Sequence, residues 1–270
     1  MFDAHPALAI PPETYLLLPI LRAGVSGEGA DLGRDEFERL VAEFHTWPDL
    51  GISRERLRQE LRSLEPWSAR RGLRAIYRLY AEERGKSRWG DKTPNYRRHL
   101  PAIAAMLPEA RFLHIVRDGR DVALSLRREW FAPAEDMAGL ARHWVEEIAA
   151  TRQAMRQCVE AGGHAIELRY EDLVREPRAT LESLCPFIEL PFDPSMLSYH
   201  HGAPARIREV GDQRLPDGRV ITKESRHARH QRVGDPPDPS RLGVWRREMS
   251  ADDQREFASI AGALLEELGY

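Results

Sequence analysis

Arg117 and Ser125 are the first residues whose types and spacing suggest a chemical role. The run 112–125 begins with apolar residues, passes through a charged turn that contains Gly119, and continues as a helical pattern. This order predicts a strand, a turn and a helix, and open α/β sheets bind ligands where such strands end. Arg117 would lie at the strand tip, and Ser125, about a turn and a half into the helix, would face the same crevice. A guanidinium and a hydroxyl that converge near a helix N-terminus form a site for a phosphate dianion.

Two further residues carry groups that could take part in a reaction. Glu13 follows two prolines and precedes an apolar run, a setting that would desolvate the carboxylate and make it a better base. Lys92 is one of only three lysines among the 40 basic residues. Because arginine supplies nearly all the other positive charge, the lysine at this position indicates a need for a compact ammonium group.

Each of these residues also has an ordinary structural interpretation. Arg117 could form a surface ion pair with Asp118, and Ser125 could be a helix residue with no special role. Glu13 could be a carboxylate that offsets the dipole at a helix start, and Lys92 could be a solvated loop lysine. The residues by themselves leave these alternatives open.

Several motifs, taken together, resemble one family. An Asp-Lys-Thr-Pro box stands at 91–94, Arg117 and Ser125 follow it, and Arg-Tyr-Glu-Asp-Leu stands at 169–173. With the segments 2–14 and 242–270, they resemble the sulfotransferases that use 3'-phosphoadenosine 5'-phosphosulfate (PAPS), closest to the bacterial and tyrosylprotein-type branch. The resemblance extends over nearly the whole chain and implies a single sulfotransferase-like domain over 1–270.

The resemblance implies a role for each candidate residue. Arg117 and Ser125 would hold the 3'-phosphate of PAPS, and Tyr170 would lie beside the nucleotide. Glu13 falls where tyrosylprotein-type members place the general base, and Lys92 would stabilise charge on the bridging oxygen of the leaving group. Glu13 and Lys92 must therefore approach each other. The acceptor would be a hydroxyl of a small molecule, a glycan or a peptide, and we expect no metal.

The pattern and the resemblance predict a three-layer α/β domain with a central parallel sheet. Strands are predicted at 87–90, 111–116 and 165–170, with helices between them. Helices at 35–44, 53–64 and 68–83 would form a helical cap that spans about residues 22–86 and lies over the nucleotide domain. Ser53 and Ser68 would be the N-caps of the second and third of these helices. Further helices are predicted at 96–107 and about 134–161, the second with a core-facing stripe of Leu140, Trp144, Ile148 and Met155.

The segment of about 200–240 is rich in Gly, Pro, Arg and His, and is predicted to be a long loop. The resemblance implies that this loop covers the nucleotide, with Arg226, Arg229 and Arg232 as candidate phosphate contacts. Histidines of this region could bind a metal, but no cysteine or carboxylate completes a ligand set. We therefore do not expect a metal site there.

The first strand of the family and its phosphosulfate-binding loop have no counterpart in the sequence. The Gly-rich stretch 24–29 is no substitute, because Glu28 would repel an anion and no strand precedes it. We expect the strand and loop to be encoded upstream of Met1, and the 270-residue form to show little transfer. The alternative is a sulfotransferase-like nucleotide-binding protein without catalysis. A nucleotide kinase would need a phosphate loop and a magnesium carboxylate that the sequence does not supply.

Composition and length bound the class of protein. A chain of 270 residues with 42% hydrophobic and 31% charged residues is typical of a soluble globular enzyme. The net charge of −3 does not suggest nucleic-acid binding. No apolar run approaches the ~18 residues of a membrane span, and no signal peptide is recognised, so we expect a cytoplasmic protein. Cys158 and Cys185 are expected to be buried free thiols. The sequence carries no signature of the acceptor or of the oligomeric state.

Overall fold

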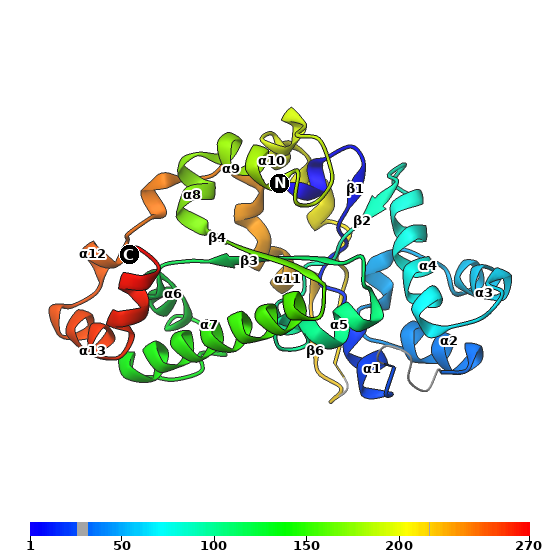
Figure 1. Cartoon of the computed structure of the whole chain (residues 1–270), viewed down its shortest axis with the longest axis horizontal. Helices are drawn as coiled ribbons and strands as arrows, with labels where there is room; N and C mark the ends of the chain where they lie inside the picture. Colours follow the sequence, from blue (N-terminus) through cyan, green and yellow to red (C-terminus); the bar gives the residue numbers. More distant parts are fainter. Residues whose placement is uncertain (26–31, 216) are drawn as a thin grey trace. The chain divides into compact units, whose positions relative to one another are not determined.

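Two parallel pairs of strands, each flanked by helices, form the α/β fold (Figure 1). The structure is a computed structural model that describes residues 1–25, 32–215 and 217–270, with the side chains of 229 and 231 not described. The chain divides into two compact units: unit 1 comprises Met1–Ala110 and Leu190–Pro236, and unit 2 comprises Arg111–Glu189 and Pro237–Tyr270. Most of the Gly-rich stretch 24–29 therefore lies outside the described residues.

Unit 1 contains a short parallel pair and the predicted helices of the first third of the chain. β1 (Leu8–Ala9) pairs with β2 (Arg88–Trp89). The helices are α1 (Leu17–Arg22), α2 (Arg34–Ala42), α3 (Arg54–Ser63) and α4 (Ala69–Glu82). Ser53 and Ser68 accept hydrogen bonds from the backbone N–H groups of Arg56 and Arg71, which confirms both predicted N-caps.

The predicted helix 96–107 is divided into two shorter helices. A 3₁₀ helix, η3 (Pro94–Arg98), ends at His99, and α5 (Leu100–Met106) begins there with Pro101 in its first turn. Proline has no N–H to bond to the preceding turn, but it is tolerated in the first turn of a helix, so a new helix begins at this point.

The segment predicted to be a long loop instead contains regular elements. Within unit 1 these are α10 (Tyr199–Ile207), the antiparallel strands β5 (Gln213–Arg214) and β6 (Val220–Ile221), α11 (Lys223–His230) and η5 (Gln231–Gly234); the 3₁₀ helix η4 (Pro194–Met196) precedes the segment. The glycine and proline content misled the prediction, because α10 contains Pro204 and the β5–β6 turn uses Gly218 at a φ of +85°.

Unit 2 is built on a longer parallel pair. β3 (Arg111–Val116) pairs with β4 (His164–Arg169) over the full length of both strands, with Arg111 opposite His164. The helices that follow are α6 (Gly119–Leu126), α7 (Met137–Glu160), α8 (Tyr170–Arg175), α9 (Pro177–Leu184), η6 (Pro239–Arg241), α12 (Trp245–Glu248) and α13 (Ala251–Glu267). Figure 1 shows α7 running along this strand pair. The sequence predicts one central parallel sheet. The described strands instead form three separate pairs: the parallel pair β1–β2 in unit 1, the parallel pair β3–β4 in unit 2 and the short antiparallel pair β5–β6.

The core of unit 2 confirms the predicted stripe of α7. Leu140, Trp144 and Ile148 are buried against Val116 of β3 and Phe257 of α13, and Met155, the fourth predicted residue, is buried outside this cluster. Burial of these apolar surfaces fixes α6, α7 and α13 around the end of β3, where the predicted anion site begins.

The two cysteines, Cys158 and Cys185, are buried free thiols, as the sequence predicts. No helix in the described residues has both the length and the apolar character that a bilayer span requires.

Candidate functional site

Glu13 and Lys92 are adjacent in unit 1, although they lie far apart in the sequence. The Lys92 ammonium forms an ion pair with Glu13 Oε1, and the Tyr15 hydroxyl donates to Glu13 Oε2 over 2.9 Å. The Glu13 side chain is 29% exposed and that of Lys92 is 62% exposed, so the pair borders solvent. We name Glu13, Tyr15 and Lys92 the carboxylate–amine site. The prediction that Glu13 and Lys92 approach each other is confirmed.

A buried hydrogen-bond network joins the two loops that carry Glu13 and Lys92. Asp91 Oδ2 accepts hydrogen bonds from the Thr14 hydroxyl at 2.5 Å and from the Tyr77 hydroxyl at 2.6 Å. Thr14 is next to Glu13 in the sequence, and Asp91 is next to Lys92. The Thr14–Asp91 bond therefore holds the two segments that carry Glu13 and Lys92 together. The Asp91 carboxylate is therefore the anchor of the carboxylate–amine site.

Further hydroxyl groups complete this network. The second carboxylate oxygen of Asp91, Oδ1, accepts from the Thr93 hydroxyl at 2.7 Å. The Tyr96 hydroxyl lies 3.1 Å from Thr14 Oγ1 and accepts the backbone N–H of Leu17. Every hydroxyl here has a polar partner, which a buried group needs to avoid a desolvation penalty.

Burial governs the protonation of the groups around the anchor. It raises the pKa of Asp91, and hydrogen bonds from Thr14 and other hydroxyls oppose that shift. Burial also raises the pKa of Tyr77 and Tyr96, and the negative charge of Asp91 raises both further. The pKa of Tyr15 is raised by burial and then by the charge of Glu13. These phenols therefore remain neutral hydrogen-bond donors.

Arg117 lies at the end of β3 in unit 2, where the strand–turn–helix pattern predicts it. One guanidinium nitrogen, Nη2, donates to the carbonyl oxygen of Arg241 at 3.1 Å and lies 3.4 Å from Asp121 Oδ2. The guanidinium carbon lies 5.0 Å from the centre of the Tyr170 ring, at the end of β4. The buried Nε of Arg117 has no hydrogen-bond partner in the described part of the chain. A guanidinium with a free N–H beside an aromatic ring fits an added anionic group.

The surface ion pair between Arg117 and Asp118, one of the alternatives above, does not form. Asp118 is buried; it caps α6 through the backbone N–H of Arg120 and accepts two bonds from the Arg120 guanidinium. It also accepts the indole N–H of Trp245 at 3.0 Å. Asp121, with a fully buried side chain, accepts the backbone N–H groups of Trp245 and Gly243. These two carboxylates attach the 243–245 segment to the start of α6.

Ser125 lies one helical turn beyond Asp121 on α6, and it is exposed. Arg117, Asp121 and Ser125 recur at intervals of four residues, so they follow one side of the helix and its entry. The hydrogen bonds that the structure gives the Arg117 side chain reach Asp121 and Arg241. The structure therefore places Ser125 on the expected side of α6 but brings it into no recorded contact with Arg117.

The candidate phosphate contacts in the 226–232 region have other positions in unit 1. Arg226 donates two bonds to the buried carboxylate of Asp49 and one to the carbonyl oxygen of Gly211. The Arg229 side chain is not described, and Arg232 is exposed. Arg226 is thus committed to an internal ion pair. Within the residues described, no group of three or more His, Cys, Asp or Glu side chains could hold a metal ion.

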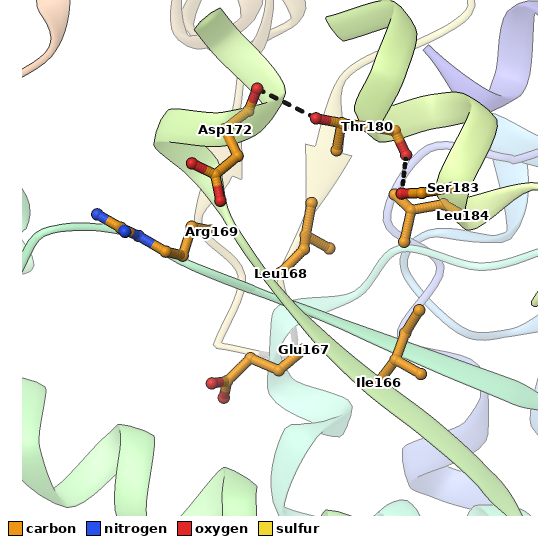
Figure 2. A pocket seen from close by; sticks show the side chains of 8 residues that line it. All are labelled: Ile166, Glu167, Leu168, Arg169, Asp172, Thr180, Ser183 and Leu184. Atoms are coloured by element: carbon orange, nitrogen blue, oxygen red, sulfur yellow. Dashed lines mark hydrogen bonds between the residues drawn. The ribbon is translucent and has the colours of Figure 1, made fainter. Parts of the chain in front are cut away.

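A pocket of about 440 Å³ lies beside β4, α8 and α9 (Figure 2). Its hydroxyl groups are used within the chain: Thr180 donates to the Asp172 carbonyl oxygen and Ser183 to the Thr180 carbonyl oxygen. Glu167, at its edge, is paired with Arg152. The pocket contains none of the predicted site residues, so we do not assign the chemistry to it.

Sequence reasoning missed Tyr15 and the Thr14–Asp91 anchor. Their closeness in the sequence to Glu13 or Lys92 is the only signal that could have pointed to these residues. The bond between Thr14 and Asp91 joins positions that are 77 residues apart, and no periodic pattern reveals such a contact.

Comparisons with known proteins agree with the motifs. The model of a family described as "Sulfotransferase family" matches residues 1–194, a range that includes all five predicted site residues. Protein-tyrosine sulfotransferase 1 of Danio rerio is 28% identical over 181 residues, which are 67% of this chain and 47% of that protein. Nodulation protein NoeE of Sinorhizobium fredii (strain NBRC 101917 / NGR234) is 23% identical over 291 residues, covering 100% of this chain and 62% of that protein. The chain thus spans less than two thirds of the length of both relatives.

A solved structure shares the fold. The sulfotransferase domain from the curacin biosynthetic pathway superposes with a TM-score of 0.50 and 18% identity, over 95% of this chain and 89% of that one. This likeness extends through both units of the chain.

Proposed function

Because the chain belongs to the sulfotransferase family, we propose that it transfers a sulfuryl group from PAPS to a hydroxyl acceptor. The observation that supports this most is the pairing of Glu13 with Lys92, two groups of opposite charge that distant segments bring together. Such a pair provides both a proton acceptor and a cation, which are the two groups that sulfuryl transfer requires of the protein.

In the proposed reaction Glu13 takes the proton of the acceptor hydroxyl. The acceptor oxygen forms a bond to sulfur while the bond from sulfur to the bridging phosphate oxygen breaks. The products are the sulfated acceptor and adenosine 3',5'-bisphosphate. Lys92 would stabilise the negative charge that builds on the bridging oxygen, in a transfer governed by positioning and charge neutralisation.

We propose that Arg117, Ser125 and Tyr170 bind the 3'-phosphate side of the nucleotide. The unpartnered Nε of Arg117 supports this role, because it leaves a donor for a phosphate oxygen. The Tyr170 ring beside the guanidinium would limit the orientations of that side chain. The negative charge of Asp121 is offset by two backbone N–H groups, so it does not by itself exclude an anion from this position.

Calorimetry with adenosine 3',5'-bisphosphate tests the nucleotide site. Arg117→Ala should weaken binding by about tenfold or more, since a charge-assisted hydrogen bond contributes roughly 1.5–3 kcal/mol. Arg128→Ala is the matched control, because Arg128 lies just beyond the same helix and pairs only with Glu248 among the ion pairs of the described residues. Equal affinities of the wild-type and Arg117→Ala proteins would contradict the assignment.

Transfer of ³⁵S from labelled PAPS tests the reaction itself. A tyrosine-containing peptide is the first acceptor to try, because one relative is named a protein-tyrosine sulfotransferase, and glycans and small hydroxyl compounds follow. Because the sequence contains no counterpart of the family's phosphosulfate-binding loop, we expect slow formation of labelled product with the 270-residue wild-type chain, and none with Glu13→Gln. Nucleotide binding without transfer to any acceptor would favour the non-catalytic nucleotide-binding alternative.

A further inference from the structure

Both oxygens of the Glu13 carboxylate have a donor in the structure. Lys92 pairs with Oε1, and the Tyr15 hydroxyl donates to Oε2 over 2.9 Å. In the proposed reaction Lys92 acts on the leaving group, so its hold on Glu13 is temporary. Tyr15 is then the contact that keeps the carboxylate in place.

The backbone directs the Tyr15 ring toward Glu13 by an uncommon conformation. Tyr15 has a φ of +53°, in the left-handed region that bulky side chains rarely adopt. Its neighbours Thr14 and Leu16 are buried to 1% and 0% exposure, and the Thr14 carbonyl oxygen accepts a bond from the Thr46 hydroxyl. Because the chain is fixed on both sides, the unfavourable conformation persists, and such strain concentrates at functional sites.

The surroundings of the Tyr15 ring keep its hydroxyl protonated. Burial and the negative charges of Glu13 and Asp91 raise its pKa, and the positive charge of Arg226 opposes them. The His45 ring lies 6.3 Å away, centre to centre, and its pKa is lowered by burial and by Arg226. The phenol is therefore a lasting hydrogen-bond donor rather than a base.

We propose that Tyr15 is a positioning residue that holds Glu13 Oε2, so that the other carboxylate oxygen meets the acceptor hydroxyl. This inference rests on the proposed role of Glu13 as the base. Tyr15 itself forms no bond to the reacting groups. Without its hydroxyl, the Glu13 side chain gains freedom to rotate once Lys92 turns to the leaving group, and the productive geometry is populated less often.

Tyr15→Phe removes only the hydroxyl and tests this role in the transfer assay. We expect kcat to fall by about tenfold or more, while the KM for PAPS stays within about twofold. Tyr199→Phe is the control: it also removes a hydroxyl of unit 1, one that donates to the Asp235 carbonyl oxygen, and it should leave kcat unchanged. An unchanged kcat in Tyr15→Phe, in a protein that Glu13→Gln inactivates, would overturn the positioning role.

Fluorine NMR provides a readout that does not depend on turnover. In protein labelled with 3-fluorotyrosine, the Tyr15 signal is identified by its loss in Tyr15→Phe, and its chemical shift is measured at neutral pH. Glu13→Gln should move this signal, because it replaces the charged acceptor of the Tyr15 hydroxyl with a neutral amide. An unmoved Tyr15 signal overturns the contact between the two side chains. A moved signal in a protein that transfers no sulfuryl group to any acceptor overturns the proposed function instead.

Discussion

Lys92, which we propose acts in the reaction, contributes little to the fold. Its ion pair with Glu13 borders solvent, and exposed pairs contribute only about 0–1 kcal/mol to stability. The Asp91 anchor, in contrast, is buried and satisfies three hydroxyl groups. We therefore expect Asp91 to support the stability of this loop and Lys92 to support the proposed reaction.

Lys92→Ala is therefore expected to change the free energy of unfolding by no more than about 0.5 kcal/mol. Transfer activity should fall by about 10²–10³-fold, as when one preorganised group that stabilises developing charge is removed. Urea denaturation and the ³⁵S assay measure the two effects. Lys92→Arg should restore little activity if the compact ammonium is required. If the activity of Lys92→Ala fell only in proportion to its loss of folded protein, the proposed role of Lys92 in the reaction would be contradicted.

Asp91 predicts a specific dependence of stability on pH. Burial raises its pKa, so the folded protein binds this proton more tightly than the unfolded chain does. A stabilising contribution is therefore complete below the unfolded pKa, about 3.9, and is lost as pH rises through the higher folded pKa. The unfolding free energy of the wild type, minus that of Asp91→Asn, should fall over this range. Urea titrations at a series of pH values test this, and a difference that rises with pH would contradict it.

Sequence reasoning predicted that Glu13 and Lys92 lie together, and the structure places them so, but it did not predict the residues around them. Glu13 stands out by the two prolines before it, Lys92 by the scarcity of lysine, and Arg117 by the strand–turn–helix pattern, each supported by the family resemblance. Tyr15 does not, because its role depends on a positive φ that only the buried neighbours impose. The same holds for Arg117 and its partners, since the bonds from Gly243 and Trp245 to Asp121 join segments more than 120 residues apart.

At the scale of elements, the junction of β3 and α6 depends on close packing. Gly119 begins α6, and a Cβ at this position would lie 2.5 Å from the Trp144 ring and 2.8 Å from the Phe257 ring. The glycine is therefore required by the approach of α7 and α13 rather than by its backbone angles. Sequence analysis located the turn correctly but could not show this packing reason.

Gly119→Ala is expected to destabilise the protein by about 1–3 kcal/mol, because it overpacks the core of unit 2. Gly262→Ala is the matched control, since Gly262 lies inside α13 and an added Cβ there meets nothing within 4 Å. That control should stabilise the protein by about 0.5–1 kcal/mol, as alanine is the better helix former. Chemical denaturation measures the change in unfolding free energy of each variant, and the two changes should have opposite signs. Equal changes would show that close packing does not explain the glycine at position 119.

The predicted elements agree with the structure where local patterns decide them. The strand 111–116, the long amphipathic helix α7 and the two serine caps could all be predicted, because periodicity and capping act over a few residues. β1 was missed, because a strand of two residues has no period of its own. α10 and α11 were missed because glycine, proline and histidine obscure the helical pattern over 200–240.

At the scale of the whole molecule, the two thiols report on one unit. Cys158 and Cys185 both belong to unit 2, both are buried, and burial raises the pKa of each thiol. Reaction with a thiol reagent therefore requires unit 2 to open. Arg117 and Tyr170, the proposed nucleotide contacts, lie in the same unit. Nucleotide binding should therefore make the opening of unit 2 less frequent.

Adenosine 3',5'-bisphosphate at about 100 times its Kd is expected to stabilise the bound state by about 2.7 kcal/mol. Labelling of the two thiols by Ellman's reagent should then slow by about 100-fold, provided that opening releases the nucleotide. Arg117→Ala should show little slowing at the same concentration. A wild-type labelling rate that does not respond to the nucleotide would place its binding outside unit 2.

The interleaved course of the chain also has an evolutionary consequence. Each unit draws on two separate stretches, so no single breakpoint in the gene leaves both units whole. A fusion or truncation after residue 110 would remove 190–236 from unit 1, and one after residue 189 would remove 237–270 from unit 2. The carboxylate–amine site and the Arg117 site must therefore be inherited as one piece. We therefore expect variants of either site to arise by substitutions and loop insertions rather than by exchange of one unit for another.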